Sequence, residues 1–199
     1  MEELKIKVKK LREDAVIPSY AHYGDVGMDM TAVDVEYDAE KDMYIYQTGL
    51  AFESDFNICQ LLFVRSSNCK TEAYLCNHVG IADSAIYRGE IQFRFKNREN
   101  IESYAHREAM KQVMFSLNMT SRLDPNGKLN NHIQIASDLY KQVYDDVIER
   151  AKNLEFAPYK IGDKIGQMVF ITYPTVNLIE VNELNETVRG EKGFGSTGN

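Results

Sequence analysis

The 199 residues of the chain are enough for one domain, or for one domain that carries a large insertion. Hydrophobic residues make up 44% and charged residues 27%, which is typical of a folded globular protein and excludes disordered and fibrous chains. The net charge of −7, with no run of Lys and Arg longer than a pair, argues against nucleic-acid binding through a basic face.

No apolar run approaches the roughly 18 residues that suggest a membrane span, and the N-terminal segment "MEELKIKVKKLRED" lacks the hydrophobic centre of a signal peptide. We therefore expect a cytoplasmic protein without membrane attachment. The cysteines Cys59, Cys69 and Cys76 are odd in number and lack CxxC spacing, so we expect free thiols and neither a disulfide nor a zinc site.

The first 97 residues are predicted to form short strands. Alternating or β-branched runs such as "LKIKVKKL", "MYIYQTGLAFES", "CQLLFV" and "IQFRFKN" are separated by turns rich in Gly and Asx residues. This pattern indicates an all-β domain built of short strands.

The pattern changes near Arg98. Residues 101–120 contain neither Gly nor Pro and repeat apolar residues every fourth position, and residues 135–151 carry a cleaner helical stripe. The turn sequence "LDPNGKLNN" between them predicts a helical hairpin. Strand character returns after Pro158 in "YKIGDKIGQMVFITY" and "TVNLIEV", so residues 99–156 are predicted to be an insertion between two strands.

Two polar clusters in the first half of the chain could carry chemistry. "GDVGMDM" places Asp25 and Asp29 around a glycine, where a carboxylate could face a divalent cation, although an ordinary turn uses the same residues. "VRSSNCK" offers Arg65, Ser66 and Ser67 directly after an apolar strand, where they could hold a phosphate or simply form a polar turn.

Two further clusters lie on either side of the predicted insertion. "NHVGIADSAIYRGE" contains Asn77, Asp83 and Tyr87, in which an ionised Asp could take a proton from water and a Tyr could offer a flat apolar face. The plain alternatives are a turn-capping Asp and a core Tyr. "IGDKIGQM" carries Lys164 and Gln167 beside a Gly-Asp turn.

The chain ends in "RGEKGFGSTGN", which sets Arg189, Phe194, Ser196 and Thr197 on a glycine-rich frame. Such a segment could wrap a phosphate with backbone amides and cover a flat base with its ring, or it could be a frayed terminus.

In this order, the five clusters resemble the five motifs of the trimeric dUTPase family, over about residues 20–97 and 158–198. The resemblance implies a mainly β, jelly-roll-like barrel with an inserted α-helical hairpin, assembled as a homotrimer with its active sites at subunit interfaces. It also implies hydrolysis of dUTP to dUMP and pyrophosphate, with Mg2+ bound to the triphosphate. The residues do not distinguish a phage from a bacterial source.

The resemblance also implies roles for individual residues. Asp83 would activate the attacking water, Tyr87 would pack on the deoxyribose, and Asp29 would reach Mg2+ through water. Phosphate contacts would come from Arg65, Ser66, Ser67, Gln167, Arg189, Ser196 and Thr197. Uracil contacts would come from Asn77, from the backbone of Val79, Gly80 and Ile81, and from Phe194, with Gly195 also in the substrate-binding set.

The expected organisation follows from these assignments. Residues 1–98 and 157–188 would form the β domain, 99–156 the helical insertion, and 189–199 a flexible C-terminal lid over the substrate.

Four positions depart from the family pattern. Val64 stands where Pro is usual before RSS, Lys164 where Arg is usual, and Ala82 where a β-branched residue precedes the catalytic Asp. Asp83 and Tyr87 are four residues apart and not three, which would reverse one side chain in a hairpin unless a β-bulge absorbs the extra residue. We expect that bulge at residues 85–86.

Two alternatives stay open. A dCTP deaminase-like enzyme would share the fold, but that family uses a glutamate base and lacks the GFGSTG tail. The insertion could instead add a regulatory protein-binding module to the same enzyme, because Met110, Met114 and Met119 form an adaptable surface. The plain reading is that this surface packs on the β domain or on a neighbouring subunit.

Overall fold

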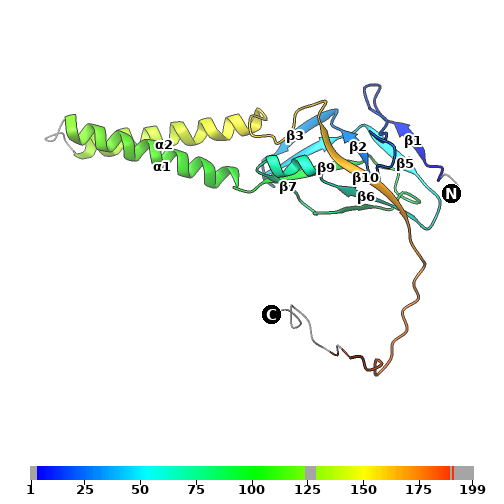
Figure 1. Ribbon diagram of the computed structural model, residues 1–199. Helices are drawn as coiled ribbons and strands as arrows, with labels where there is room; N and C mark the ends of the chain where they lie inside the picture. Colours follow the sequence, from blue (N-terminus) through cyan, green and yellow to red (C-terminus); the bar gives the residue numbers. More distant parts are fainter. Residues whose placement is uncertain (1–3, 124–128, 189, 191–199) are drawn as a thin grey trace.

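The computed structural model describes residues 4–123, 129–188 and 190, which form two facing antiparallel sheets, a short two-stranded sheet and a projecting helical hairpin (Figure 1). The mainly β architecture with two inserted helices is the one predicted. Neither helix in the described part of the chain is both long and apolar enough to span a bilayer.

Each large sheet has four strands. The first sheet has the order β2 (Met28–Thr31), β10 (Lys164–Thr172), β6 (Ile58–Phe63) and β8 (Gly80–Ala82). The second has the order β3 (Asp34–Asp38), β4 (Met43–Gln47), β9 (Gln92–Asn97) and β7 (Ala73–Leu75). The remaining pair is β1 (Lys7–Lys10) with β5 (Leu50–Glu53), and the short 3-10 helix η1 covers Ser66–Lys70.

The core lies between the two large sheets because alternate side chains of each strand point inward. Tyr46, Phe93 and Phe95 from the second sheet are at most 1% exposed, as are Met30 and Met168 from the first. The sequence alternation in "IQFRFKN" therefore predicted the inward face of β9 correctly.

Gly166 of β10 lies against the ring of Phe93 in the opposite sheet. The register between β10 and β2 shifts at residues 164–166, and a Cβ on Gly166 would lie within 2.8 Å of three ring carbons of Phe93. Only a glycine fits beneath that ring.

The insertion forms helices α1 (Ile101–Leu123) and α2 (Leu129–Lys152). The side chain of Asn100 accepts the backbone N–H groups of Glu102 and Ser103, which caps the start of α1. Asp42, on the turn between β3 and β4, accepts the N–H of Ile101 and so ties the helix to the β domain.

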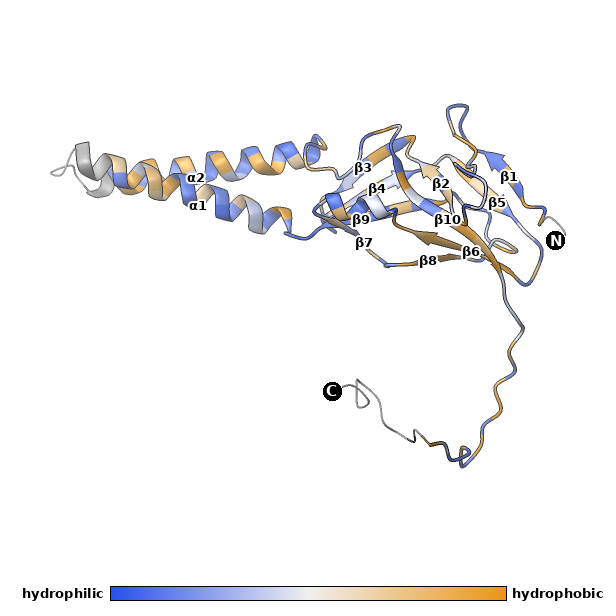
Figure 2. Cartoon of the chain, in the orientation of Figure 1, coloured by the Kyte–Doolittle hydropathy of each residue, from blue (hydrophilic) through white to orange (hydrophobic). Residues whose placement is uncertain are grey.

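The apolar stripe of the hairpin is buried between its own helices. Ala105, Ala109 and Val113 of α1 are buried, as are Val147 and Ala151 of α2, and hydrophobic and hydrophilic residues alternate along both helices (Figure 2). The hairpin projects away from the sheets (Figure 1), so of the expected packing on the β domain or on a neighbouring subunit, the first holds only at the root and the second stays a prediction.

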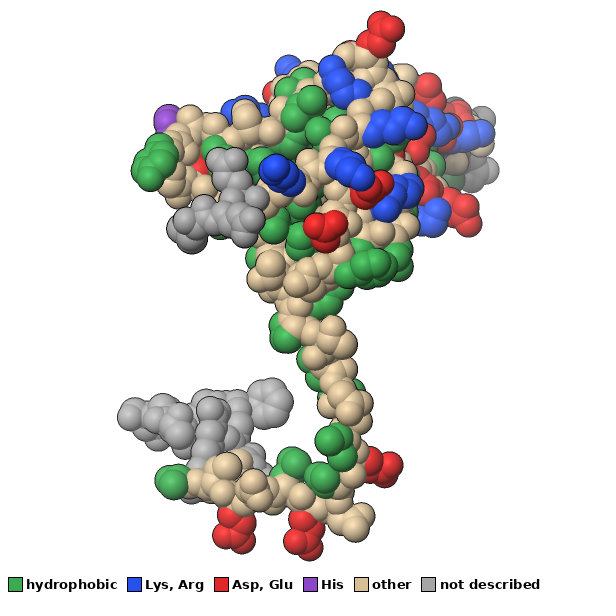
Figure 3. Space-filling model, turned by 90° about the vertical axis from the view of Figure 1, so that its right-hand side faces the viewer, with side chains coloured by type: hydrophobic (Ala, Val, Ile, Leu, Met, Phe, Trp, Pro, Cys, Tyr) green, Lys and Arg blue, Asp and Glu red, His purple; other side chains and the backbone are tan. Residues whose placement is uncertain are grey.

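After β10 the chain leaves the domain as an extended segment (Figure 3). "TVNLIEV" was expected to be a strand, but residues 175–181 pair with no other strand in the described chain. Its apolar side chains are exposed, with Leu178 at 89% and Ile179 at 77%. The strand prediction is therefore wrong for this single chain, because a strand requires a neighbour to receive its backbone hydrogen bonds.

Candidate functional site

The strand β8 ends in a turn that sets the position of Asp83. Residues 84–86 form this turn, in which the N–H groups of Ile86 and Tyr87 both donate to the Asp83 carbonyl, at 2.9 and 2.7 Å. Ser84, the first residue of the turn, is buried, and its hydroxyl is hydrogen-bonded to the hydroxyl of Ser54 at 2.5 Å. The extra residue between Asp83 and Tyr87 is thus absorbed by a turn, and the predicted β-bulge is wrong in form.

Asp83 and Tyr87 nevertheless line the same pocket, which has a volume of about 520 Å3. This size lies within the usual range of small-molecule sites. Three other residues predicted for the substrate also line it: Asn77, Gly80 and Ile81. Val79 lies outside the lining and is 40% exposed.

The predicted site residues leave out the rest of the pocket lining, which consists of apolar Leu62, Ala82 and Ile91 and of Cys76, Glu90, Gln92 and Arg94. The guanidinium of Arg94 donates to the side-chain oxygen of Gln92 at 3.1 Å. Alternation did place both residues on the face of β9 opposite its phenylalanines, but only the pairing of β7 with β9 turns this face into a pocket wall. Burial raises the pKa of the Cys76 thiol despite the nearby Lys96 and Arg94 charges.

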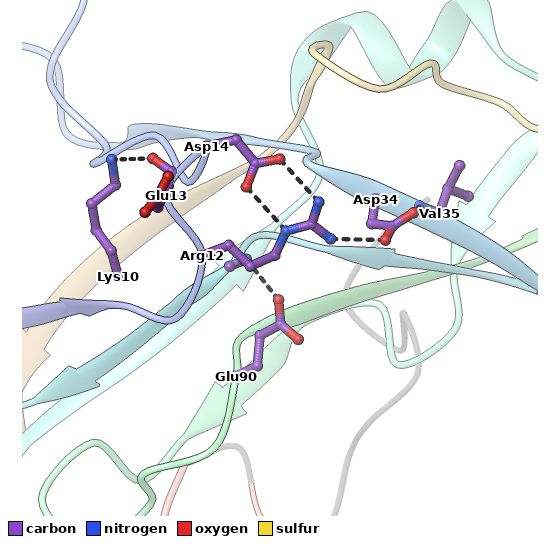
Figure 4. A network of polar contacts seen from close by, with 8 residues as sticks. Lys10, Arg12, Glu13, Asp14, Asp34, Val35 and Glu90 are labelled. Carbon is purple, nitrogen blue, oxygen red and sulfur yellow. Dashed lines mark hydrogen bonds and ion pairs between the residues drawn. The ribbon is translucent and has the colours of Figure 1, made fainter.

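Glu90 connects the pocket wall to the N-terminal part of the domain (Figure 4). Its carboxylate accepts the N–H of Gly49 at 2.6 Å, and its carbonyl accepts the Tyr87 hydroxyl at 3.1 Å. Nearby, Arg12 donates to both Asp14 and Asp34. The segment that carries Tyr87 is therefore anchored through Glu90 to Gly49 at its C-terminal end.

A second polar cluster surrounds Asp29 on the first sheet. Asp29 pairs in register with Gln167 of β10, and its carboxylate accepts hydrogen bonds from Arg65 at 2.9 Å, Lys164 at 2.8 Å and Gln167 at 3.3 Å. Burial opposes ionisation of Asp29, but the hydrogen bonds from Lys164 and Gln167 and the charge of Arg65 outweigh it and lower the pKa of Asp29. Asp29 is therefore a carboxylate held between two cations.

Lys164 occupies the place where the family pattern has Arg. Its ammonium makes one hydrogen bond to Asp29, where a guanidinium fork could make two. Ser66 and Ser67 begin η1 directly after Arg65, with Ser66 exposed and Ser67 half-buried. Four of the predicted phosphate-binding residues, Arg65, Ser66, Ser67 and Gln167, thus lie in or directly after this cluster.

The structure does not bring the two clusters together within one chain. Gln167 pairs with Phe63, whereas β8 pairs with β6 only from Leu62 to Gln60, so Asp83 lies about four residues further along the sheet. With two strand spacings between β10 and β8, this offset corresponds to a separation of roughly 15 Å.

The donor set near Asp29 is small. In the described part of the chain, no three His, Cys, Asp or Glu side chains lie close enough together to hold a metal ion. Mg2+ is commonly bound by one or two carboxylates together with substrate phosphates and waters, so a single carboxylate fits an ion that arrives with its ligand. The remaining predicted site residues, Arg189, Phe194, Gly195, Ser196 and Thr197, lie outside the described residues.

Taken together, two antiparallel sheets around one core and a polar pocket at the end of β8 define a mainly β protein with a site for a small polar molecule. No protein-family model matches the sequence. Curated relatives match over nearly its whole length. The deoxyuridine 5'-triphosphate nucleotidohydrolase of Clostridioides difficile is 26% identical over 97% of this chain and 97% of its own length. That of Helicobacter hepaticus is 28% identical over 100% of this chain and 91% of its own length.

Solved structures share the fold. The Staphylococcus bacteriophage 80alpha dUTPase with dUpNHpp superposes with a TM-score of 0.60 at 20% identity and covers 98% of each chain. The dUTPase from phage phi11 of S. aureus has a TM-score of 0.54 at 18% identity and covers 92% of this chain and 99% of its own. The chain is thus similar over nearly its whole length to curated dUTP nucleotidohydrolases, and it shares the fold of the phage dUTPases.

Proposed function

We propose that the protein hydrolyses dUTP to dUMP and pyrophosphate. The observation that carries this proposal is the pocket of about 520 Å3 in which Asn77, Asp83 and Tyr87, predicted from sequence alone, lie together. The curated relatives named as dUTP nucleotidohydrolases support the same reaction. The cytoplasm, where nucleotide triphosphates are found, would be its place of action.

In the proposed reaction, Asp83 accepts a proton from a water molecule held beside it. The water oxygen then forms a bond to the α-phosphorus as the bond from that phosphorus to the α,β-bridging oxygen breaks, and pyrophosphate leaves. Asn77 and the backbone of residues 79–81 would bind the uracil edge, and Tyr87 would pack against the deoxyribose. Most of the rate enhancement would come from positioning and charge stabilisation.

The phosphate-binding residues would come from a neighbouring subunit. Within one chain, the backbone of Gln167 lies roughly 15 Å from that of Asp83, and Arg65, two residues beyond Phe63, lies further along the sheet. A homotrimer would bring Arg65, Ser66, Ser67 and Gln167 of one subunit to the pocket of the next. Residues 189–199 would close over the substrate, with Arg189, Ser196 and Thr197 on the γ-phosphate, Phe194 on the uracil and Gly195 beside it.

The proposed metal is Mg2+, bound to the triphosphate, where it would neutralise charge on the phosphate oxygens. Asp29 would reach it only through water, because Arg65, Lys164 and Gln167 already donate to the Asp29 carboxylate. A solved structure of the phage phi11 dUTPase is described as revealing the coordination of a structural Mg(II) ion.

Release of pyrophosphate tests the reaction directly. Purified protein with Mg2+ should release pyrophosphate from dUTP, and no release under these conditions would refute the proposal. Supplying dCTP and measuring ammonia tests the deaminase alternative, which we do not expect.

We propose a second role for the helical insertion, as a binding surface for a regulatory protein. Helix α1 exposes Met110, Met114 and Met119 at 51%, 60% and 43%, with Phe115 beside them at 67%, on a hairpin that projects from the domain. The phage 80alpha dUTPase is described as controlling transfer of virulence genes by a G protein-like mechanism. Deletion of residues 99–156 should leave trimerisation and turnover intact, and loss of either would favour a structural role.

A further inference from the structure

Tyr159 is fixed in the core a short distance after the helical insertion. It lies seven residues beyond Lys152, the last residue of α2, and is 8% exposed. The Tyr46 hydroxyl donates to the Tyr159 carbonyl at 2.9 Å and accepts the Tyr159 N–H at 3.0 Å. The ring of Tyr159 packs against Tyr46 and Phe95 at centroid distances of 6.0 and 5.2 Å. Both the backbone and the ring are therefore held in place.

The hydroxyl of Tyr159 reaches from this core to the phosphate-binding turn. It donates to the side-chain oxygen of Asn68 at 2.8 Å. Asn68 lies in the middle of η1, and its amide nitrogen donates to the Ala73 carbonyl at 3.1 Å. The backbone carbonyl of Asn68 accepts both the N–H and the hydroxyl of Thr71. Asn68 thus joins η1 to β7 on one side and to the core on the other.

The helix η1 lies at the surface of the domain, and Arg65 at its start is hydrogen-bonded to Asp29. None of the residues of Ser66–Lys70, all of which the structure describes, is buried. A short 3-10 helix has weak hydrogen-bond geometry of its own, so its orientation depends on contacts with the rest of the fold. The hydrogen bond from Tyr159 is a direct link from the buried core to this helix, and it lies one residue from Ser67.

The same region contacts the root of the hairpin. Phe156, three residues before Tyr159, packs on Tyr104 of α1 at 5.5 Å, and its carbonyl accepts the side-chain N–H of Asn97 at 3.1 Å. A cavity of about 590 Å3 lies between η1 and this root, with Lys70 and Thr71 on one wall. The hairpin root and the phosphate-binding turn therefore line one pocket, and Phe156 of the root packs against the core cluster that contains Tyr159.

We propose that Tyr159 is a positioning residue that sets the orientation of Ser66 and Ser67 through Asn68, and that it links the root of the helical insertion to phosphate binding. This proposal rests on the proposed function of Ser66 and Ser67. It predicts that the loss of one buried hydroxyl weakens binding of phosphorylated ligands and leaves uracil recognition unchanged, because the pocket that contains Asn77 and Asp83 lies elsewhere on the domain.

Tyr159→Phe removes only the hydroxyl and keeps the ring and the backbone contacts to Tyr46. We expect KM for dUTP to rise roughly fivefold with little change in kcat, the factor that corresponds to one ordinary hydrogen bond. The inhibition constant of dUDP should rise by a similar factor, and that of deoxyuridine, which carries no phosphate, should not change.

Tyr44→Phe is the matched control. Tyr44 is also a core tyrosine, 1% exposed, and among the described residues its hydroxyl is buried without a hydrogen-bond partner. This variant should therefore leave KM unchanged. Asn68→Ala removes the other partner of the same hydrogen bond. In the double variant Tyr159→Phe/Asn68→Ala, the change in the logarithm of KM should be smaller than the sum of the changes in the two single variants.

Equal KM values for wild type and Tyr159→Phe would overturn the proposal, as would additive effects in the double variant or an equal loss of deoxyuridine binding. If the wild-type protein released no pyrophosphate from dUTP, the proposed function itself would fail. The two failures are thus distinguishable.

Discussion

Gly166→Ala tests how tightly the two sheets pack at the centre of the domain. The added methyl group would lie within 2.8 Å of three ring carbons of Phe93, which is itself 1% exposed and cannot swing into solvent. Overpacking of a dense core typically lowers the free energy of unfolding by about 1–3 kcal/mol. Because the added methyl group would overlap three ring carbons of a buried side chain, we expect a loss of about 3 kcal/mol. For a chain of this length the loss corresponds to a fall in Tm of about 6–12 °C.

Thermal unfolding measured at fixed protein concentration provides the assay, and Gly162→Ala provides the reference. Gly162 has a φ of +90° and nothing within 4 Å of an added Cβ, so alanine there meets backbone strain of about 1–2 kcal/mol without a clash. Phe93→Leu should remove most of the additional cost of Gly166→Ala, since it removes the ring. Equal unfolding temperatures for the two alanine variants, or no rescue by Phe93→Leu, would refute the packing argument.

Three further predictions concern the site. Asp83→Asn should lower kcat about 10²- to 10⁴-fold with nucleotide affinity nearly retained, as measured by steady-state kinetics and equilibrium binding, and a loss of only a few-fold would contradict its role as base. Asp29→Asn should destabilise the protein by about 2 kcal/mol at neutral pH, a value reduced by the half-exposure of Lys164. Because the pKa of Asp29 is lowered on folding, the stabilisation is present above its unfolded pKa near ~4 and is lost as pH falls through the folded value. The free energies of unfolding of wild type and Asp29→Asn, measured by denaturant titration, should therefore converge in acid. A difference between them that stays constant down to pH 2 would contradict a contribution from the ion pairs. Truncation before Arg189 should leave the trimer intact by light scattering and abolish most turnover, and an active truncated enzyme would contradict the proposed lid.

Local pattern predicted the elements whose neighbours are close in sequence. The end of "IQFRFKN" coincides with the end of β9 at Asn97, and the absence of Gly and Pro after Ile101 predicted a helix that begins at that residue. The helical stripe was predicted correctly, but within the chain the surface that buries it is not the β domain, because pattern does not identify a partner. The partner is the other helix of the hairpin.

The predictions that failed depended on contacts between distant segments. The β character of residues 175–181 favoured a strand, yet a strand also requires a partner, and no strand in the described part of the chain pairs with this segment. The spacing of Asp83 and Tyr87 indicated one extra residue. The turn that accommodates this residue is packed by a contact between buried Ser84 and Ser54, which lies thirty residues earlier in the chain and could not be paired with it from the sequence. Arg94 was missed because a pocket wall is formed by strands that are adjacent only after folding.

The hairpin also has a mechanical consequence. With 23 residues in α1 and a rise of about 1.5 Å per residue, its tip lies about 35 Å from the root. At that length, a tilt of about 10° at the root moves the tip by about 6 Å. Conversely, a force applied at the tip produces a torque at the root that grows with the length of the hairpin. The root, packed through Tyr104 and Phe156 beside η1, is the fulcrum.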